Sequence, residues 1–351
     1  MRVNLTKKQR FLNACNRLPV DMTPVWIMRQ AGRFMASYRR KRQIHSFIEM
    51  CKKPDVAAEV TLLPVERLDV DAAIIFADIL LPLEGMGVGF SFSAQDGPVI
   101  HNPVRTTSQI KKLVITQPEE SLDYVLKAIK IVKNELKENI PLIGFSGAPF
   151  TLASYLIEGG HSTNYIVTKT MMLKTPELWN SLMDKLSKVV LLYLSAQIKA
   201  GADVVQLFDS WAGCLSPYDY EHYVMPYNRM ILNGLKKYHV PVINFATDNA
   251  GLLELMSRSG GNVIGIDWRI NIDQAWKRIG YDKAIQGNLD PAVLLGPYEE
   301  IKKHVKAILN MTRGHNGHIF NLGHGVLPTT PESNVRALVD LVHEFTQKSN
   351  K

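Results

Sequence analysis

The chain has 351 residues and a mass of 39.5 kDa, enough for one large domain or two medium ones. Hydrophobic residues make up 46% and charged residues 21%, which excludes a mostly disordered chain. There is no apolar run near the roughly 20 residues of a membrane helix, no secretory leader pattern and only three scattered cysteines, so we expect a cytoplasmic protein. The net charge of +8 leaves nucleic acid, a membrane surface or an acidic small molecule as possible partners.

We interpret residues 1–20 as an N-terminal helical extension. After it, short apolar runs rich in β-branched residues recur along the chain. Each run has the length of a strand that is buried on both faces. Helical patterns such as Pro54–Arg67, Pro176–Ala200, Pro217–His239, Ile272–Ile279 and Pro331–Gln347 separate them. The eight predicted strands are Pro24–Met28, Ala72–Phe76, Pro141–Phe145, Val204–Phe208, Pro241–Phe245, Asn262–Ile266, Ala284–Gly287 and His318–Leu322.

Eight strands that alternate with helices predict an α/β fold, a closed (β/α)8 TIM barrel. Residues Leu83–Thr107 are rich in Gly, Ser and Pro, and we interpret them as a small excursion, with a hairpin as one form, inserted after the second strand. An open doubly wound sheet is the alternative, although such folds normally have a glycine-rich first turn that is lacking here. No segment has linker composition, so we expect a single catalytic domain over residues 1–351.

In such a barrel, catalytic groups follow the carboxyl ends of the strands. The loop after the first predicted strand holds six cations from Arg29 to Arg42, and no carboxylate occurs between Asp21 and Glu49. Arginine binds carboxylate or phosphate through two hydrogen bonds, so this loop predicts a small substrate with several anionic groups. The polar residues after the eight strands are Arg29, Gln30 and Arg33, then Asp78, Ser146, Asp209 and Ser210, Asp248, Asp267, Asn288 and His324.

Alternatives remain for the basic loop. If it is helical, Arg29 and Arg33 share one face, whereas Arg39, Arg40 and Lys41 can equally be a solvated basic stripe. Nucleic acid fits poorly because no exposed aromatic residues are interleaved with the cations.

Three further residues are candidates for the site. Asp78 follows an apolar run, so it either caps a turn or accepts hydrogen bonds from N–H donors of a ligand. Tyr155 lies one turn into a helix that begins near Pro149, and is either a core residue or directed toward the barrel mouth. His324 lies between two glycines, which leaves its imidazole exposed. His315 and His318 precede the strand end and no cysteine is near, so we expect no metal site.

Five motifs occur in order between Pro24 and Gly325, and together they resemble the uroporphyrinogen decarboxylase family. They are Pro24-x-Trp26 with Met28 to Arg33, Phe76-x-Asp78-Ile79-Leu80, Gly144 to Leu152 followed by Tyr155, Phe208-x-Ser210, and Asn321 to Gly325.

The resemblance implies a carboxy-lyase of porphyrin and heme biosynthesis. Members of the family convert uroporphyrinogen III to coproporphyrinogen III by decarboxylating its four acetate side chains, without cofactor or metal, and commonly form homodimers. The resemblance further implies no nucleic acid and no membrane as partners. It makes Asp78, Arg29 and Tyr155 catalytic. Its substrate-binding residues are Arg29, Gln30, Ala31, Gly32, Arg33, Arg42, Asp78, Phe145, Tyr155, Ser210 and His324.

Within this picture, Asp78 holds the pyrrole nitrogens, the arginines bind carboxylates, and Tyr155, Ser210 and His324 bond to the side arms. Two other functions are the alternatives. Zinc-dependent corrinoid methyltransferases of related fold carry a His-x-Cys pair after a late strand, where this chain reads Asn244-Phe245-Ala246 with no cysteine beyond Cys214. A tetrapyrrole-binding protein without catalysis would not need Asp78.

Overall fold

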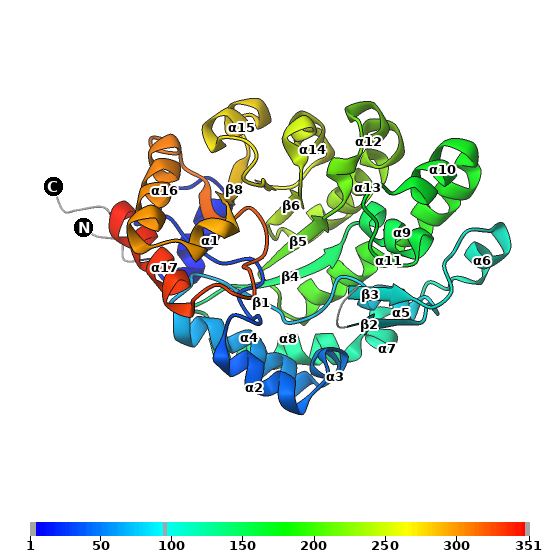
Figure 1. Cartoon of the computed structure of the whole chain (residues 1–351), viewed down its shortest axis with the longest axis horizontal. Coiled ribbons are helices and arrows are strands. Elements are labelled where there is room, and N and C mark those ends of the chain that lie inside the picture. The colour runs from blue at the N-terminus through cyan, green and yellow to red at the C-terminus, as the bar shows by residue number, and fades with distance from the viewer. Residues whose placement is uncertain (1–4, 94–96, 348–351) are drawn as a thin grey trace.

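The computed structural model describes residues 5–93 and 97–347. A curled sheet of seven parallel strands forms its centre, with helices arranged around it (Figure 1). Seven of the eight predicted apolar runs overlap these strands, which confirms the α/β barrel class. In spatial order they are β1 (Ala73–Ile74), β4 (Leu142–Gly147), β5 (Val204–Asp209), β6 (Val242–Ala246), β7 (Val263–Gly265), β8 (Ala284–Leu289) and β9 (His318–Leu322).

The segment Pro24–Met28, predicted as the first strand, lies between the two edge strands β1 and β9. The prediction that it forms a regular strand is wrong. The segment forms a single parallel bridge, from Val25 to Phe320 of β9. Its remaining donors bond to side chains, because the Val25 amide donates to Asp71 Oδ2 at 2.8 Å and the Met28 amide to Asn321 Oδ1 at 2.9 Å. These side-chain acceptors replace the backbone carbonyls that a regular ladder would use.

Most predicted helices are confirmed, and α11 and α15 begin and end as expected. The segment Pro217–His239 was expected as one helix but divides at Val224, where Pro226 lacks the N–H that a continuous helix needs. The helices are α1 (Lys7–Cys15), α2 (Ala36–Ile44), α3 (Phe47–Lys52), α4 (Pro54–Leu68), α5 (Leu81–Gly85), α6 (Thr107–Lys112), α7 (Pro118–Ser121), α8 (Asp123–Leu136), α9 (Pro149–Glu158), α10 (Ile166–Lys174), α11 (Pro176–Ala200), α12 (Pro217–Tyr223), α13 (Met225–Leu235), α14 (Leu253–Ser259), α15 (Ile272–Ile279), α16 (Tyr298–Met311) and α17 (Glu332–Thr346).

An antiparallel pair of short strands, β2 (Phe90–Ser93) and β3 (Gly97–Ile100), lies in the segment between β1 and β4. The Ile100 amide donates to Gly159 O at 2.8 Å, so this pair is attached to the end of α9. The ring of Phe92 packs edge-on against Phe47 of α3 at 4.9 Å.

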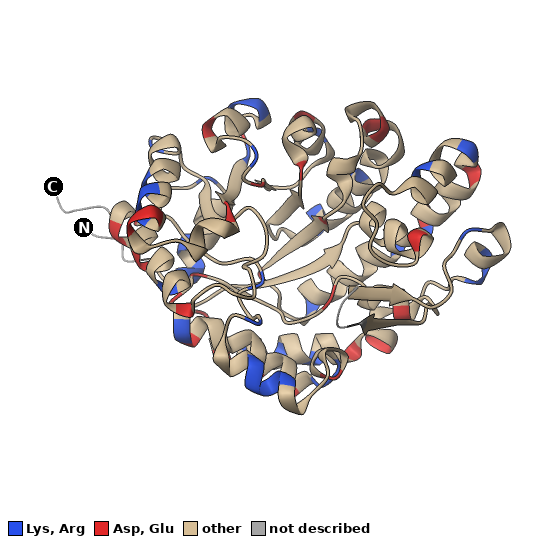
Figure 2. Cartoon of the chain, in the orientation of Figure 1, with Lys and Arg blue, Asp and Glu red and all other residues tan. Residues whose placement is uncertain are grey.

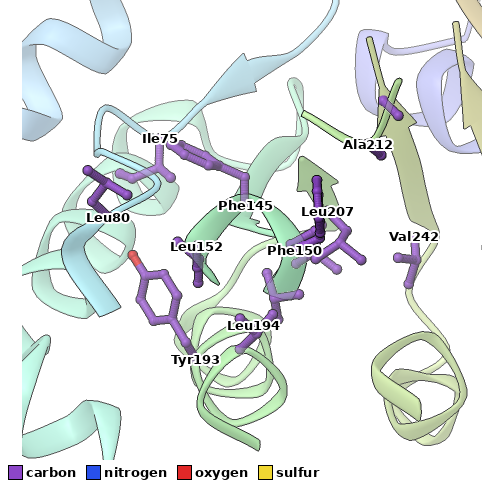
Figure 3. Packing of buried hydrophobic residues seen from close by; sticks show 14 of the residues in the cluster. Ile75, Leu80, Phe145, Phe150, Leu152, Tyr193, Leu194, Leu207, Ala212 and Val242 are labelled. Atoms are coloured by element: carbon purple, nitrogen blue, oxygen red, sulfur yellow. The ribbon is translucent and has the colours of Figure 1, made fainter. Parts of the chain in front are cut away.

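Two apolar cores hold the barrel. The larger one lies between the sheet and the surrounding helices, and Figure 3 shows part of it, where Leu207 of β5 and Phe150 of α9 lie near Leu194 of α11. The smaller core fills the barrel interior and includes Trp26 and Phe245. Phe11 of α1 belongs to the interior core as well, so α1 closes one end of the barrel and leaves the strand carboxyl ends as the open mouth.

No helix in the described part of the chain is long and apolar enough to span a bilayer.

Candidate active site

The loop after Met28 is built from tight turns and not from a helix. Arg29 has a φ of +61°, in the left-handed region, and α2 begins only at Ala36. The condition under which Arg29 and Arg33 would share a helical face is therefore not met. Gly32 makes the turn possible, because a Cβ there would lie 2.9 Å from the Arg29 carbonyl oxygen.

The Arg29 loop is joined to the loop that carries His324. The Val326 amide donates to Met28 O at 3.0 Å, and the aliphatic stem of Arg29 lies directly on Gly325. A Cβ on Gly325 would approach Arg29 Cδ to 2.3 Å, so only glycine permits this contact. The structure thus brings Arg29 and His324 together, as the positions after the first and last strands predicted.

His324 is a neutral imidazole at physiological pH. Burial, together with the positive charges of Arg29 and Arg269, lowers its pKa to about 4. Such a ring can donate one hydrogen bond and accept another.

Asp78 follows β1 and is half-buried at the mouth. Its Oδ1 accepts a hydrogen bond from the Leu80 amide at 2.8 Å, so the turn-capping interpretation is correct for that oxygen. Oδ2 has no hydrogen-bond partner among the described residues. Burial raises the pKa of Asp78 to about 6, while the Leu80 amide and the charge of Arg29 oppose that rise. The carboxylate therefore combines a fixed orientation with one oxygen available to a ligand.

Tyr155 on α9 and Trp211 after β5 form the next part of the wall. Their rings pack edge to face at 5.9 Å, and Trp211 also contacts Tyr165 at 5.6 Å. Burial raises the pKa of Tyr155 to about 12, with a further contribution from the negative charge of Asp78. Tyr155 is thus a hydrogen-bonding phenol near Asp78, and Ser210 directly precedes Trp211 and is partly exposed.

The basic residues from Arg29 to Arg42 have unequal roles. Figure 2 shows lysines and arginines gathered on α2. Arg39 donates to the carbonyl oxygens of Arg33 and Phe34, both at 2.8 Å, and Arg42 donates to His45 O at 2.6 Å. In the described part of the chain, Arg29 and Arg33 form no ion pair. Two exposed guanidinium groups therefore stand at the mouth without a carboxylate.

Two predicted binding residues point into the protein. The side chain of Gln30 is 1% exposed, accepts from the Ile27 amide at 3.1 Å and donates to Ala72 O at 3.1 Å, so it ties the loop to β1. Phe145 is buried at the end of β4 and packs edge-on against Phe208 at 5.5 Å.

Arg269, after β7, is a residue that the sequence pattern did not indicate. It binds Asp248 at 2.7 Å and the fully buried Asp267 at 2.6 Å, and its guanidinium stacks on Trp268 at 4.3 Å. The amide of Asn288 donates to Asp267 O at 2.8 Å. Asp248 follows β6 and Asp267 follows β7, whereas Asn288 lies within β8 and not after it. The contacts above bond these residues to one another's loops.

Among the described residues, no group of three or more His, Cys, Asp and Glu side chains is arranged to hold a metal ion. His318 is buried and bonds to Gly287 O at 3.0 Å, while His315 stacks on Tyr281 at 4.1 Å.

A barrel mouth that carries a half-buried carboxylate, hydrogen-bonding rings and arginines without an ion pair among the described residues is typical of a TIM-barrel enzyme. The family model described as uroporphyrinogen decarboxylase (URO-D) matches residues 6–345. The chain belongs to this family, whose members are carboxy-lyases.

Relatives named uroporphyrinogen decarboxylase are similar over almost the whole chain. Those from Carboxydothermus hydrogenoformans and Sorangium cellulosum are 55% and 54% identical, and the alignments cover 97% of this chain and 97% of each relative. The relative from Geobacter sulfurreducens is 50% identical, with coverage of 97% and 99%.

Solved structures support the fold. A methyltransferase from Methanosarcina mazei superposes with a TM-score of 0.83 at 22% identity, covering 97% of this chain and 99% of that one. A B12-independent methionine synthase from Shewanella sp. W3-18-1 gives a TM-score of 0.56 at 9% identity, covering 83% and 88%. At these identities, the likeness concerns the barrel architecture alone.

Proposed function

We propose that this chain converts uroporphyrinogen III to coproporphyrinogen III by removing the carboxyl groups of its four acetate arms. The observation that carries the proposal is Asp78, a half-buried carboxylate with one oxygen fixed by the Leu80 amide and the other available at the mouth. A tetrapyrrole presents several pyrrole N–H donors to one point, and a single central acceptor matches that pattern.

The unpaired cations fit the other half of the substrate. Arg29 and Arg33 have no ion-pair partner in the described part of the chain, so a substrate carboxylate does not have to displace an internal one. Arg42 lies on the same segment and adds a third guanidinium. In the proposed complex these arginines orient acetate and propionate arms through paired hydrogen bonds.

The chemistry requires a place for the electron pair that the departing carbon dioxide leaves behind. Protonation of the ring carbon beside the acetate-bearing one makes the pyrrole cationic, and the C–CO2 bond then breaks with its electrons entering the ring. A proton adds to the exocyclic carbon, and the first proton leaves the ring carbon. Each cycle thus replaces one carbon dioxide by one proton and restores the pyrrole.

Asp78 stabilises the cationic ring in this scheme, because a fixed carboxylate in a site that excludes water acts strongly on developing charge. Arg29 holds the reacting carboxylate beside it. Tyr155, Ser210 and the neutral His324 donate hydrogen bonds to the remaining arms. Backbone groups of Gln30, Ala31 and Gly32 and the ring of Phe145 complete the proposed contacts.

We further propose that residues 1–351 act as one catalytic domain in the cytoplasm, as a homodimer and without a cofactor. Three free cysteines, two of them buried, suit a reducing compartment.

The test is anaerobic incubation of the purified chain with uroporphyrinogen III, with and without EDTA, and chromatography of products by carboxyl number. We expect stepwise loss from eight carboxyls to four in both conditions, and severe loss of activity in Asp78→Asn and Arg29→Ala. Arg40→Ala is the matched control, since Arg40 is an exposed cation of the same segment. A folded, substrate-binding chain that removes no carboxyl group would refute the proposal and favour binding alone.

A further inference from the structure

Asp209, the last residue of β5, is an enclosed carboxylate outside the proposed substrate contacts. It is 1% exposed. Its Oδ1 accepts a hydrogen bond from Thr151 Oγ1 at 2.9 Å, and its Oδ2 accepts one from Asn228 Nδ2 at 3.0 Å. The backbone N–H of Thr151 lies close enough to this carboxylate to lower its pKa. Asp209 therefore reaches from the sheet to α9 and α13 at once.

The contact between Asp209 and Thr151 compensates for the missing side-chain cap at the start of α9. Ala148 precedes the helix and has no side chain that can accept a hydrogen bond, while Thr151 lies in the first turn. Free N–H groups at a helix start need acceptors, and a carboxylate is well suited to that end of the helix dipole. The Ala148 amide also donates to Phe208 O at 2.8 Å. The start of α9 is thus docked on the carboxyl end of β5.

This junction lies between two proposed substrate contacts. Tyr155 follows Thr151 by one helical turn, and Ser210 directly follows Asp209. The Tyr155 ring packs on Trp211, one residue further along the β5 loop. Rotation or sliding of α9 relative to β5 would separate the tyrosine hydroxyl from the Ser210 turn.

We propose that Asp209 is a positioning residue which, through Thr151, fixes Tyr155 relative to Ser210. It does not touch the substrate, and hydrogen-bonding geometry, not its charge, is what it supplies. This positioning role rests on the proposed function, because its effect is measured as the rate of decarboxylation.

The surroundings of Asp209 indicate why charge is dispensable. Its titratable neighbours are Tyr220 and Cys214, and no Lys or Arg in the described residues forms an ion pair with it. Burial raises its pKa to about 6, against the hydrogen bonds from Asn228 and Thr151. Asn228 Oδ1 has no hydrogen-bond partner among the residues that the structure describes. An asparagine at position 209 can therefore still accept a hydrogen bond from Thr151 and donate one to the oxygen of a turned Asn228 amide.

Five variants test this arrangement: Thr151→Val, Thr151→Ser, Asp209→Ala, Asp209→Asn and the control Ser154→Ala. Thr151→Val and Asp209→Ala remove the junction, so we expect kcat/KM for uroporphyrinogen III to fall about tenfold in each, and no further in the double variant. Thr151→Ser and Asp209→Asn keep the hydrogen bonds and should stay within about twofold of the parent. Ser154 is a buried hydroxyl of α9 that bonds only within the helix, to Phe150 O at 2.8 Å, so its loss should leave kcat/KM unchanged.

A pH comparison separates charge from geometry. A folded-state pKa raised to about 6 means that ionised Asp209 destabilises the fold as pH rises through that value. Asp209→Asn should therefore melt at a higher temperature than the parent at pH 7.5 and show a smaller gain at pH 4.5, with activity retained. Activity that is lost in Asp209→Asn despite this stability would overturn the claim that only geometry matters.

Thr151→Val at parental kcat/KM, in a chain folded like the parent, would overturn the positioning role itself. This variant decides the matter if Asp209→Ala does not fold. The near-ultraviolet circular dichroism that is lost on Trp211→Phe reports the ring contacts of Trp211, that with Tyr155 among them, without turnover. If the parent removes no carboxyl group, the proposed function fails, whereas a ring signal unchanged by Thr151→Val refutes the positioning role separately.

Discussion

The two ends of the barrel treat charge in opposite ways. At the closed end, the buried Asp71 accepts hydrogen bonds from Arg10 at 2.6 Å and His343 at 2.7 Å, and Arg10 binds Asp21 through two contacts of 2.8 Å. At the mouth, Arg29 and Arg33 form no ion pair in the described part of the chain, and Asp78 accepts only a backbone N–H.

The difference separates stability from function. The closed-end cluster consists of Arg10, Asp21, Asp71 and His343. It joins α1 and α17 to the segment Pro24–Met28 and to the residues before β1, so its charges hold distant parts of the chain together and pair with one another. The mouth leaves its charges for a ligand, and a half-buried carboxylate with a raised pKa, such as Asp78, is unfavourable for folding at neutral pH. Substitutions at the two ends should therefore affect different measurements.

Asp78→Asn is the sharpest test of the mouth. The asparagine keeps an oxygen for the Leu80 amide but cannot stabilise a cationic ring, so we expect kcat to fall about 10²–10³-fold. Thermal unfolding at pH 7.5 should occur at an equal or higher temperature, because the unfavourable ionised group is gone. A loss of activity accompanied by a lower melting temperature would mean that Asp78 is structural, and the contrast between the two ends would fail.

Arg10→Ala tests the closed end. Removing this guanidinium leaves Asp71 buried without its cation, which typically destabilises a protein by about 3–5 kcal/mol. Denaturant unfolding measures this loss, and KM at a temperature where the variant is folded should match the parent. Lys7→Ala is a suitable control, since Lys7 is a cation of the same helix paired with the exposed Asp69. A raised KM in Arg10→Ala would show that the two ends are coupled.

The strands were predictable because a strand that is buried on both faces is a short continuous apolar run in the sequence. The first segment could not be predicted in detail, since its donors bond to Asp71 and Asn321, one of them nearly three hundred residues away. The positions of Arg29, Asp78 and His324 were predictable because parallel strands end at one edge. No local pattern marks Arg10, Asp71 and His343 as partners, so the closed-end cluster could not be predicted from the sequence.

The candidate list after the strands was also too generous. Asp248 and Asp267 satisfy the positional rule, yet both bind Arg269, and that pairing depends on loop geometry that the sequence does not display. Gln30 likewise matches the family motif while its side chain turns inward to Ala72. Position along a strand indicates the edge on which a side chain lies, but not the direction in which it points.

The pH profile sharpens the comparison through Arg29. The pKa of Asp78 is raised to about 6 by burial and is held down by the charge of Arg29, so kcat/KM should fall as pH drops through about 6. Arg29→Ala removes the opposing charge, so this acid limb should shift to higher pH, and Arg29→Lys should leave it near the parent. Titration of the substrate carboxylates contributes equally to all three enzymes and cancels in the comparison. An unmoved limb in Arg29→Ala would separate Arg29 from Asp78.

The smallest expected effect concerns a cation of the basic segment that already has a partner. Lys41 of α2 binds Glu59 of α4 with both side chains partly exposed, the usual setting for a surface pair that contributes about 0–1 kcal/mol. Glu59→Gln should therefore change the unfolding free energy by less than about 1 kcal/mol and leave KM for uroporphyrinogen III unaltered. A clear drop in KM would mean that Lys41, once released, binds substrate carboxylates as Arg29 and Arg33 are proposed to do. Internal pairing, and not position along the chain, would then be what divides the site cations from the rest.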